Sequence, residues 1–169
     1  MDKESIRFLQ FNLNKCFAAQ SNLMVELTTL KNEHFIVLVQ EPHFHKKKPS
    51  SLNNSFIKAF HSNDDWPRAM ILCSKNLNIS IIESLSCRDT TCVTLHSSKE
   101  EVIVASCYHD IEFPEVVNNL ESVLDYAKNK GKDTLIGSDT NAHAQIWMSE
   151  KDNPRGEIFT DFIAMTIYS

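Results

Sequence analysis

The run Phe35-Ile36-Val37-Leu38-Val39, followed directly by Gln40-Glu41-Pro42, is the stretch from which the fold can be worked out. Five consecutive apolar residues are typical of a short strand that is buried on both faces. Pro42 ends the strand, because the residue before a proline and the proline itself disfavour regular continuation. The pattern therefore predicts a central strand with a carboxylate just beyond its end.

The segments before this strand predict a further strand and a helix. Ile6 to Leu13 has strand character. A helix with one buried face is expected next, because its apolar residues are spaced by three and four. These residues are Cys16, Ala19, Leu23, Leu27 and Leu30.

The middle of the chain has a different pattern, in which short β-prone stretches are separated by polar turns. They are Arg68 to Cys73, Leu77 to Ile82, Thr91 to Leu95 and Glu101 to Cys107. This spacing predicts sequential, mostly antiparallel strands.

A second helix, another strand and a last helix are expected after these stretches. Pro114 suits the first turn of the second helix, and Gly131 is placed to end it. The apolar stripe of that helix comprises Val116, Val117, Leu120, Val123, Leu124 and Ala127. Asp133 to Gly137 predicts a strand, and Ser138 to Asn153 a polar loop. The last helical pattern consists of Ile158, Phe162, Ile163 and Ile167.

These elements together predict a single domain over residues 1–169, a mixed α/β sandwich. No repeat, low-complexity segment or Pro/Gly-rich linker divides the chain. The last helical pattern approaches Ser169 without a stop signal, which predicts that the chain is part of a larger domain.

Composition narrows the functional classes. With 42% apolar and 23% charged residues, the chain is expected to be globular rather than intrinsically disordered. It has no apolar run long enough to span a membrane, and its charged start is unlike a secretory signal. Five cysteines without a CxxC pair favour reduced thiols in the nucleus or cytosol over a disulfide framework or structural zinc.

The net charge of −5 argues against strong nucleic-acid binding through charge alone, since phosphate neutralisation needs surplus Lys and Arg. An enzyme that holds a metal ion with carboxylates can still act on DNA, because the ion supplies positive charge locally. Lys46-Lys47-Lys48 is the only basic cluster, and charge patterning favours a solvated loop over a DNA contact there.

Polar residues recur where the predicted strands end, which is where open α/β sheets place their sites. The strand ends are Phe11-Asn12-Leu13-Asn14, Gln40-Glu41, Tyr108 and Gly137-Ser138-Asp139-Thr140-Asn141. A carboxylate such as Glu41 directly after a buried run is costly to desolvate unless it has a partner or binds a metal. The strand ends therefore predict a site.

Each of these elements also has a structural explanation when it is taken singly. Glu41 fits a strand that simply surfaces at Gln40. Asp139 with Asn141 fits an ordinary polar turn, and the two asparagines of the first strand end fit the approach to a helix cap. Tyr108 fits the edge of a core. Only the order and spacing of the whole set favour a site.

In that order, the strand ends resemble the exonuclease–endonuclease–phosphatase superfamily, whose members use an Asn-x-Asn/Asp strand end, a Gln-Glu pair, a Tyr and a Gly-Asp-x-Asn-type motif. A later stretch resembles the Asn-Ala-His…Trp-x-Ser…Asn-x-Arg-Gly-Glu signature of apurinic-like endonucleases from arthropod-type non-LTR retrotransposons. It comprises Asn141-Ala142-His143, Trp147-Met148-Ser149 and Asn153-Pro154-Arg155-Gly156-Glu157. The resemblance covers essentially the whole chain. It implies a DNase I-like four-layer α/β (α+β) sandwich, with two mixed β-sheets flanked by helices, incomplete at the C-terminus.

The resemblance also implies roles for individual residues. Glu41 is the principal ligand of Mg²⁺, for which Mn²⁺ can substitute, and Asn14 lies close to the metal where relatives often have Asp. Asn12 and Asn141 hydrogen-bond the phosphate or orient the water. Asp139 positions or activates the nucleophile, and Tyr108 stabilises developing negative charge. The expected DNA contacts are His143, Trp147, Ser149, Asn153 and Arg155.

Two features depart from the family. Met148 stands where relatives usually carry a small residue, often Gly. The family also finishes with a late Asp and a Ser-Asp-His, and this sequence stops before them; His143 belongs to the loop motif and does not replace that His. We therefore expect very weak or no DNA nicking, and aggregation through an unpaired strand edge.

The expected function is Mg²⁺-dependent nicking of double-stranded DNA for target-primed reverse transcription, with a reverse transcriptase in the parent protein and no membrane partner. Nuclear residence is expected from the life cycle of such elements. Three alternatives stay open: a superfamily phosphatase acting on small phosphate esters, a catalytically dead retroelement remnant, and a zinc module built on His43-x-His45 and cysteines. The stretch from Trp147 to Gly156 argues against the phosphatase, and the zinc module lacks ligand spacing.

Overall fold

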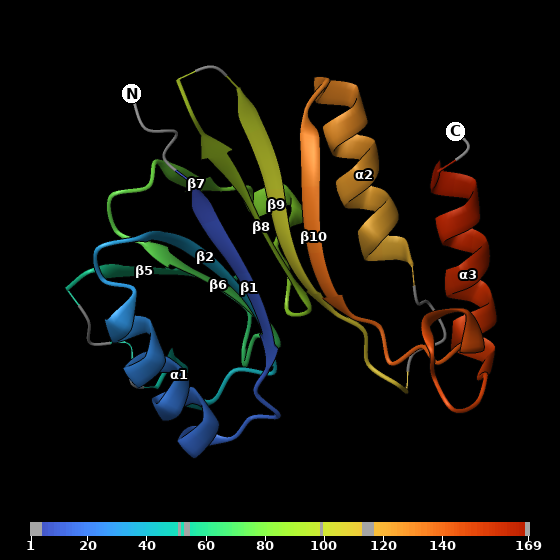
Figure 1. Ribbon diagram of the computed structural model, residues 1–169, viewed down its shortest axis with the longest axis horizontal. Coiled ribbons are helices and arrows are strands. Elements are labelled where there is room, and N and C mark those ends of the chain that lie inside the picture. Colours follow the sequence, from blue (N-terminus) through green and yellow to red (C-terminus); the bar gives the residue numbers. More distant parts are fainter. Residues whose placement is uncertain (1–4, 51, 53–54, 99, 113–116, 168–169) are drawn as a thin grey trace.

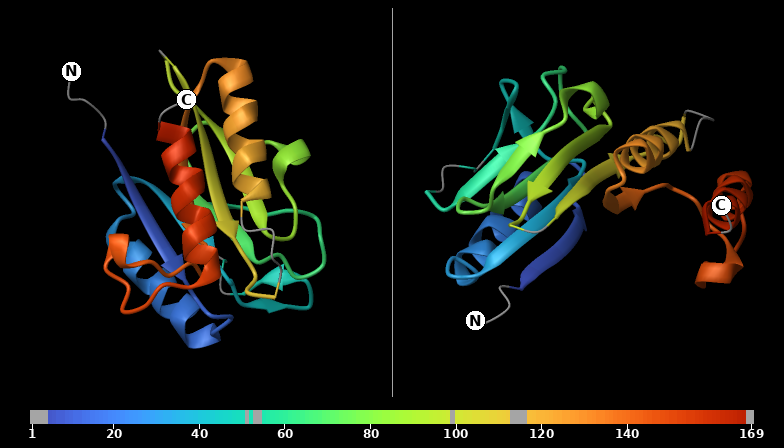
Figure 2. Two further views of the ribbon diagram at one scale, coloured as in Figure 1. Left: turned by 90° about the vertical axis from the view of Figure 1, so that its right-hand side faces the viewer. Right: turned by 90° about the horizontal axis from the view of Figure 1, so that it is seen from above.

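The computed structural model describes residues 5–50, 52, 55–98, 100–112 and 117–167. Two four-stranded sheets pack against each other in this structure, and helices cover their outer faces (Figures 1 and 2). The first sheet has the order β1-β2-β6-β5, with β1 (Ile6–Asn12), β2 (His34–Gln40), β5 (Ile57–Phe60) and β6 (Ala69–Ser74). The second has the order β10-β9-β8-β7, with β7 (Ile79–Ile81), β8 (Thr90–His96), β9 (Glu101–Tyr108) and β10 (Asp133–Asp139).

Both sheets are mixed. In the first sheet β1 and β2 run parallel, and in the second β9 and β10 run parallel, while the other neighbours are antiparallel. A short hairpin, β3 (Phe44–His45) and β4 (Lys48–Pro49), follows the first parallel pair, and its exposed turn holds Lys46 and Lys47. The helices are α1 (Phe17–Thr29), α2 (Asn118–Lys130) and α3 (Pro154–Ile167).

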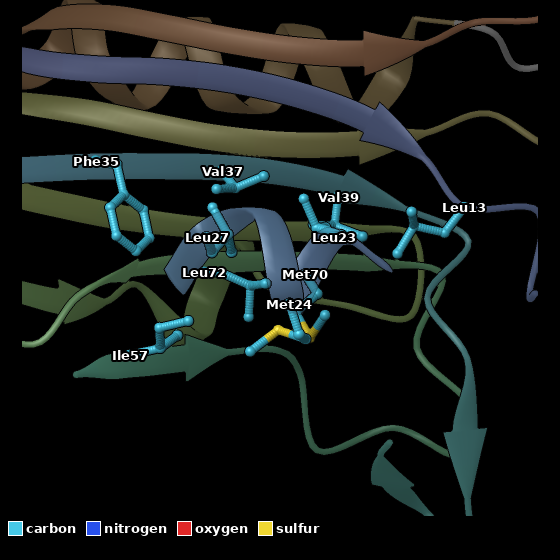
Figure 3. Close-up of a cluster of buried hydrophobic side chains, with 10 residues drawn as sticks. All are labelled: Leu13, Leu23, Met24, Leu27, Phe35, Val37, Val39, Ile57, Met70 and Leu72. Atoms are coloured by element: carbon cyan, nitrogen blue, oxygen red, sulfur yellow. The ribbon is translucent and has the colours of Figure 1, made fainter. Parts of the chain in front are cut away.

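The alternation of side chains along β2 explains why the run is apolar throughout. Phe35, Val37 and Val39 point toward α1 and pack there against its buried stripe of Leu23, Met24 and Leu27 (Figure 3). Ile36 and Leu38 point the other way and pack against the second sheet. The prediction of a strand buried on both faces is confirmed, because every residue of Phe35–Val39 is buried.

The second sheet is covered on its outer side by α2. Leu120, Val123 and Ala127 of this helix pack on Ile103 and Ala105 of β9. The four layers are thus α1, the first sheet, the second sheet and α2, which confirms the DNase I-like sandwich. Among the described helices, none combines the length and apolar character that crossing a bilayer requires.

The predicted series of antiparallel strands is correct for β7, β8 and β9 but wrong for the strand predicted over Arg68 to Cys73. That strand, β6, lies in the first sheet between β2 and β5. The sequence pattern did not predict β5, which has only four residues, so the pairing that places β6 was not evident. Sheet membership depends on contacts far apart in the sequence, which local periodicity does not encode.

The predicted end of α2 is confirmed, its predicted start is not tested, and the packing face of α3 differs from the prediction. Gly131 ends α2 in the left-handed conformation with φ of 60°, as predicted. The expected start at Pro114 and the first part of the stripe, Val116, lie outside the described residues, and Val117 directly precedes the helix. In α3 the packing face is Phe159 and Phe162, whereas Ile158 is 44% exposed.

The last residue of β2, Gln40, links the two sheets through a fully buried amide. Its Nε2 donates to Ser106 Oγ on β9 at 3.0 Å and to the Gly137 carbonyl on β10 at 3.2 Å. Ser106 Oγ in turn donates to the Val39 carbonyl at 3.0 Å. A buried amide with these partners fixes how the sheets are staggered, because any slide would leave polar groups without partners.

Replacing Gln40 by methionine, which has a similar volume, is expected to lower the free energy of unfolding by about 1–3 kcal/mol, because buried acceptors lose their donor. Urea denaturation measures this change. Gln145→Met is the matched control, since this glutamine is exposed and should change stability by less than about 0.5 kcal/mol. Equal effects of the two substitutions would contradict the role given to Gln40.

Candidate active site

The carboxyl ends of both parallel pairs lie at one rim of the sandwich, at the lower side of Figure 1. In the first sheet Asn12 is level with Gln40, and the Leu13 N–H donates to the Gln40 carbonyl at 2.9 Å. In the second sheet Tyr108 is level with Asp139. Polar residues from both sheets therefore lie at the same edge, as predicted from the residues at the ends of the strands.

A direct contact joins the two sheets at this rim. Asn12 Nδ2 donates to Asp139 Oδ2 at 2.5 Å, across 127 residues of sequence. Asp139 Oδ1 accepts from the Asn141 N–H at 3.2 Å, and Asn141 Nδ2 donates to the His109 carbonyl at 2.9 Å. The structure thus brings Asn12, Asp139 and Asn141 together, and both oxygens of the Asp139 carboxylate have a defined orientation.

Glu41 reaches the rim from the first sheet as a nearly buried residue, 9% exposed. Its N–H donates to the Arg68 carbonyl at 2.8 Å, and its carbonyl accepts from the Lys15 N–H at 2.8 Å. The Lys15 ammonium lies 3.0 Å from Glu41 Oε1. Asn14, the second predicted metal ligand, precedes Lys15; its side chain is exposed and its N–H donates to Asn12 Oδ1 at 2.7 Å.

Left-handed backbone conformations are concentrated at this rim. Asn14, Lys15, Glu41 and Asn141 have φ values of 47°, 52°, 49° and 51°. For residues with a side chain such conformations are unfavourable and persist only where the surrounding structure imposes them, often at functional sites. The chain therefore turns sharply where these strands end.

Arg68 is a site residue that the sequence analysis missed. Its guanidinium is almost buried and pairs with Asp89, at 2.7 Å through Nη2, and with Asp110. It also lies over the Tyr108 ring, 5.0 Å from the centroid. The hydrogen bond with Asp89 is the main reason why the Arg68 pKa is raised. The signal in the sequence was a charged residue directly before the fully buried strand β6.

Tyr108 is held with its hydroxyl protonated. Burial raises the pKa of the Tyr108 hydroxyl, and the negative charges of Glu41, Asp110 and Asp139 raise it further, while Arg68 partly offsets them. At neutral pH the hydroxyl therefore remains available as a hydrogen-bond donor. Glu41 and Asp139 thus both lie near enough to Tyr108 for their charges to raise the pKa of its hydroxyl.

Comparison with known proteins adds independent observations. Residues 102–169 match a family model described as endonuclease-reverse transcriptase. The endonuclease domain of TRAS1, a telomere-specific non-LTR retrotransposon, has the same fold, with a TM-score of 0.76 and 22% identity over 95% of this chain and 70% of that one.

The family match covers the later part of the chain, and the likeness to the TRAS1 domain shows that the two share a fold.

A second solved structure, an endonuclease/exonuclease/phosphatase family protein from Leptotrichia buccalis C-1013-b, is 9% identical with a TM-score of 0.48, covering 82% of this chain and 66% of that one. A search of curated proteins gave no match.

The loop after β10 carries the residues predicted to contact DNA. His143 is exposed, and Trp147 packs edge-on against Phe159 with ring centroids 5.9 Å apart. Ser149 is half-buried. Contacts of these three residues with DNA stay predictions.

The other two predicted contacts, Asn153 and Arg155, hold the loop itself. Asn153 Oδ1 accepts from the N–H groups of His143 and Gly156 at 3.0 and 2.7 Å. Arg155 is 9% exposed, and its guanidinium donates to the Thr140 carbonyl at 3.1 Å and the His109 carbonyl at 3.4 Å. This geometry favours a structural role for both residues, and their contact with DNA stays a prediction.

Two positions of the loop after β10 are explained by the backbone. At Gly156 a Cβ atom would lie 1.9 Å from the His143 carbonyl oxygen, so only glycine permits this approach. Met148 has φ of 65° and is 96% exposed. A glycine adopts this conformation more readily than methionine does.

Arg68→Met is expected to lower the free energy of unfolding by about 2–4 kcal/mol, because the partly buried Asp89 and Asp110 lose their common partner. Arg68→Lys should keep only part of the stability that Arg68→Met loses, since an ammonium cannot pair with two carboxylates in the same forked geometry. The control is Arg7→Met, which removes a pair with Glu33 at 2.8 Å between half-exposed side chains. This control should change stability by at most about 1 kcal/mol. Similar losses in urea denaturation for both sites would contradict the assignment.

His109 should make stability depend on pH. Its side chain is buried, and burial, followed by the charge of Arg155, lowers the pKa of the imidazole to about 4 from an ordinary 6.5. The unfolded chain thus binds the proton more readily, so stability present above pH 6.5 is lost as the pH falls toward 4, by about 2–3 kcal/mol.

Unfolding free energies at several pH values measure this loss. His109→Gln should flatten the dependence between pH 6.5 and pH 4. The exposed His143→Gln control should leave it unchanged. An unaltered slope in the His109 variant would show that another group is responsible.

Proposed function

We propose that this chain is the endonuclease domain of a non-LTR retrotransposon, which uses Mg²⁺ to nick double-stranded DNA so that the new 3′ end can prime reverse transcription. The observation that carries the proposal is the contact of Asn12 with Asp139, at 2.5 Å, beside Glu41 and Tyr108 at one rim. The fold shared with the TRAS1 endonuclease domain and the family description endonuclease-reverse transcriptase support it. A reverse transcriptase in the parent protein follows from the same proposal.

The donor groups at the rim fit a hard divalent cation. Glu41 supplies a carboxylate and Asn14 an amide oxygen, and Mg²⁺ prefers oxygen ligands while keeping several waters. Among the described residues no three His, Cys, Asp or Glu gather as a metal cluster. The ion pair of the Lys15 ammonium with Glu41 Oε1, at 3.0 Å, supports the proposal that this carboxylate faces a cation. We propose Glu41 and Asn14 as ligands of Mg²⁺, with Mn²⁺ as a substitute.

The chain's own residues orient the reacting groups. A bound divalent ion supplies positive charge that neutralises a phosphodiester during attack. We propose that Asp139 accepts a proton from the attacking water, and its hydrogen bonds with Asn12 and the Asn141 N–H support this role because they orient the carboxylate. The amides of Asn12 and Asn141 hydrogen-bond the phosphate or the water. The Tyr108 hydroxyl, which stays protonated, donates to an oxygen that gains negative charge.

We also propose that residues 1–169 belong to one domain. In the parent element the protein acts on nuclear DNA, although synthesis places it first in the cytoplasm.

Metal binding tests the ligand assignment without requiring turnover. Mn²⁺ binding, followed by the loss of the free-ion signal in electron paramagnetic resonance, should show one site. Glu41→Gln should weaken binding at least about tenfold, because an amide replaces the charged ligand. Glu33→Gln is the control, since this exposed carboxylate pairs with Arg7 away from the rim. Binding that is insensitive to Glu41→Gln would contradict the assignment.

Relaxation of supercoiled plasmid, with protein in excess, tests the reaction itself. Nicking that requires Mg²⁺ is expected, and neither Glu41→Gln nor Asp139→Asn should nick at a measurable rate. Nicking unaffected by either substitution would contradict the site. Faster release of phosphate from small phosphate esters than cleavage of DNA would favour a phosphatase.

A further inference from the structure

Lys15 is attached to Glu41 at two points. Its N–H donates to the Glu41 carbonyl at 2.8 Å, and its ammonium lies 3.0 Å from Glu41 Oε1. The left-handed conformations of Asn14 and Lys15 reverse the chain after β1, which lets the side chain fold back onto the residue that its own backbone contacts. The pair is therefore organised by the backbone, unlike an ion pair between two freely moving surface side chains.

The two partners differ in their exposure to solvent. The Glu41 side chain is 11% exposed, so its carboxylate has lost most of its water and needs a cation nearby. The Lys15 side chain is 62% exposed, so its ammonium can leave the carboxylate and be hydrated without disturbing the core. One partner is fixed and the other is exchangeable.

Lys15 also acts on the rest of the rim. Its charge contributes to lowering the pKa of Asp110, after the Glu112 N–H and Arg68. Arg68, by contrast, is engaged by Asp89 and Asp110 and almost buried, so it is not free to exchange. Of the two cations that pair with these carboxylates, Lys15 is therefore the one that a metal ion can replace.

We propose that Lys15 is an internal counter-ion of Glu41, which neutralises and orients this carboxylate in the metal-free protein and is displaced when a divalent ion binds. This inference rests on the proposed function, because it takes Glu41 as the metal ligand. Competition follows directly, since two cations cannot occupy the same carboxylate oxygen at close range without repulsion. Lys15 thereby sets how much free metal the site needs.

Mn²⁺ binding to Lys15→Met is the first test. Methionine keeps an unbranched side chain and the same backbone demands, but it removes the competing charge. Affinity for Mn²⁺ should rise about two- to fivefold, the upper part of the range expected for an ion pair with one exposed partner. Lys15→Arg, which keeps the charge, is the matched control and should bind as the unaltered protein does. Unchanged or weaker binding by Lys15→Met would overturn the inference.

A double-mutant cycle separates this inference from the proposed function. Melting of the single variants Lys15→Met and Glu41→Gln and of the double variant should show coupling in EDTA, where the ion pair forms. The coupling should disappear at saturating Mg²⁺, where the metal replaces Lys15. Absence of coupling in EDTA overturns the inference, whatever metal binding shows. Coupling in EDTA without any Glu41-dependent metal binding would instead overturn the proposed function, and with it the displacement of Lys15.

Discussion

The buried amide of Gln40 is the contact on which the geometry of the rim depends. It bonds Ser106 on β9 and Gly137 on β10, and each of these lies two residues before a site residue, Tyr108 or Asp139. Side chains two residues apart on a strand point to the same face. Fixing Ser106 and Gly137 against Gln40 therefore also fixes the positions of Tyr108 and Asp139 along the rim. Glu41, the neighbour of Gln40, therefore meets them at one edge. If one sheet slid by one residue along the other, the Glu41 carboxylate would move away from Tyr108 and Asp139. The buried Gln40 amide would also lose its hydrogen-bond acceptors.

Several residues at the rim keep an unfavourable left-handed backbone conformation because hydrogen bonds to neighbouring strands hold them in it. Left-handed residues that carry a side chain each cost about 1–3 kcal/mol, and Lys15 and Glu41 are two of those present here. Both are held by backbone bonds: Lys15 to the Glu41 carbonyl, and Glu41 to the Arg68 carbonyl. These bonds connect β1, β2 and β6, so the turns are part of the sheet rather than loose ends. The packed sheet therefore holds Lys15 and Glu41 in conformations that they would not keep in a loop surrounded by water.

Local periodicity was sufficient for much of this architecture. The buried run of β2, the packing of α1 through Leu23 and Leu27, and the left-handed end of α2 at Gly131 follow from spacing and from the properties of single residue types; Cys16, predicted to share that face of α1, is exposed and precedes the helix. The meeting of Asn12 with Asp139 followed from a resemblance in the order of motifs, which carries information from long-range contacts that one segment lacks. The placement of β6, the ion pairs of Arg68 and the burial of Arg155 did not follow, because each depends on partners distant in sequence. A charged residue beside an apolar run gives no indication of which carboxylate will face it.

Lys15 and Arg68 offset carboxylates near Tyr108, which would let a chain of net charge −5 hold the proposed site for a phosphate. Glu41, Asp89, Asp110 and Asp139 all lie close to Tyr108 or Arg68, and together they would repel a phosphate. Arg68 neutralises Asp89 and Asp110 permanently, since removing its guanidinium would leave charges in a partly desolvated place. Arg68 also lies over the Tyr108 ring, so one side chain both neutralises the two carboxylates and contacts the tyrosine.

Glu41 differs from Asp89 and Asp110, because the partner of its carboxylate, Lys15, is exposed to solvent. A permanent buried partner at Glu41 would prevent metal binding, whereas no partner would leave a nearly buried charge uncompensated. An exchangeable ammonium meets both conditions, which is a physical reason for a lysine to follow the Asn-x-Asn strand end.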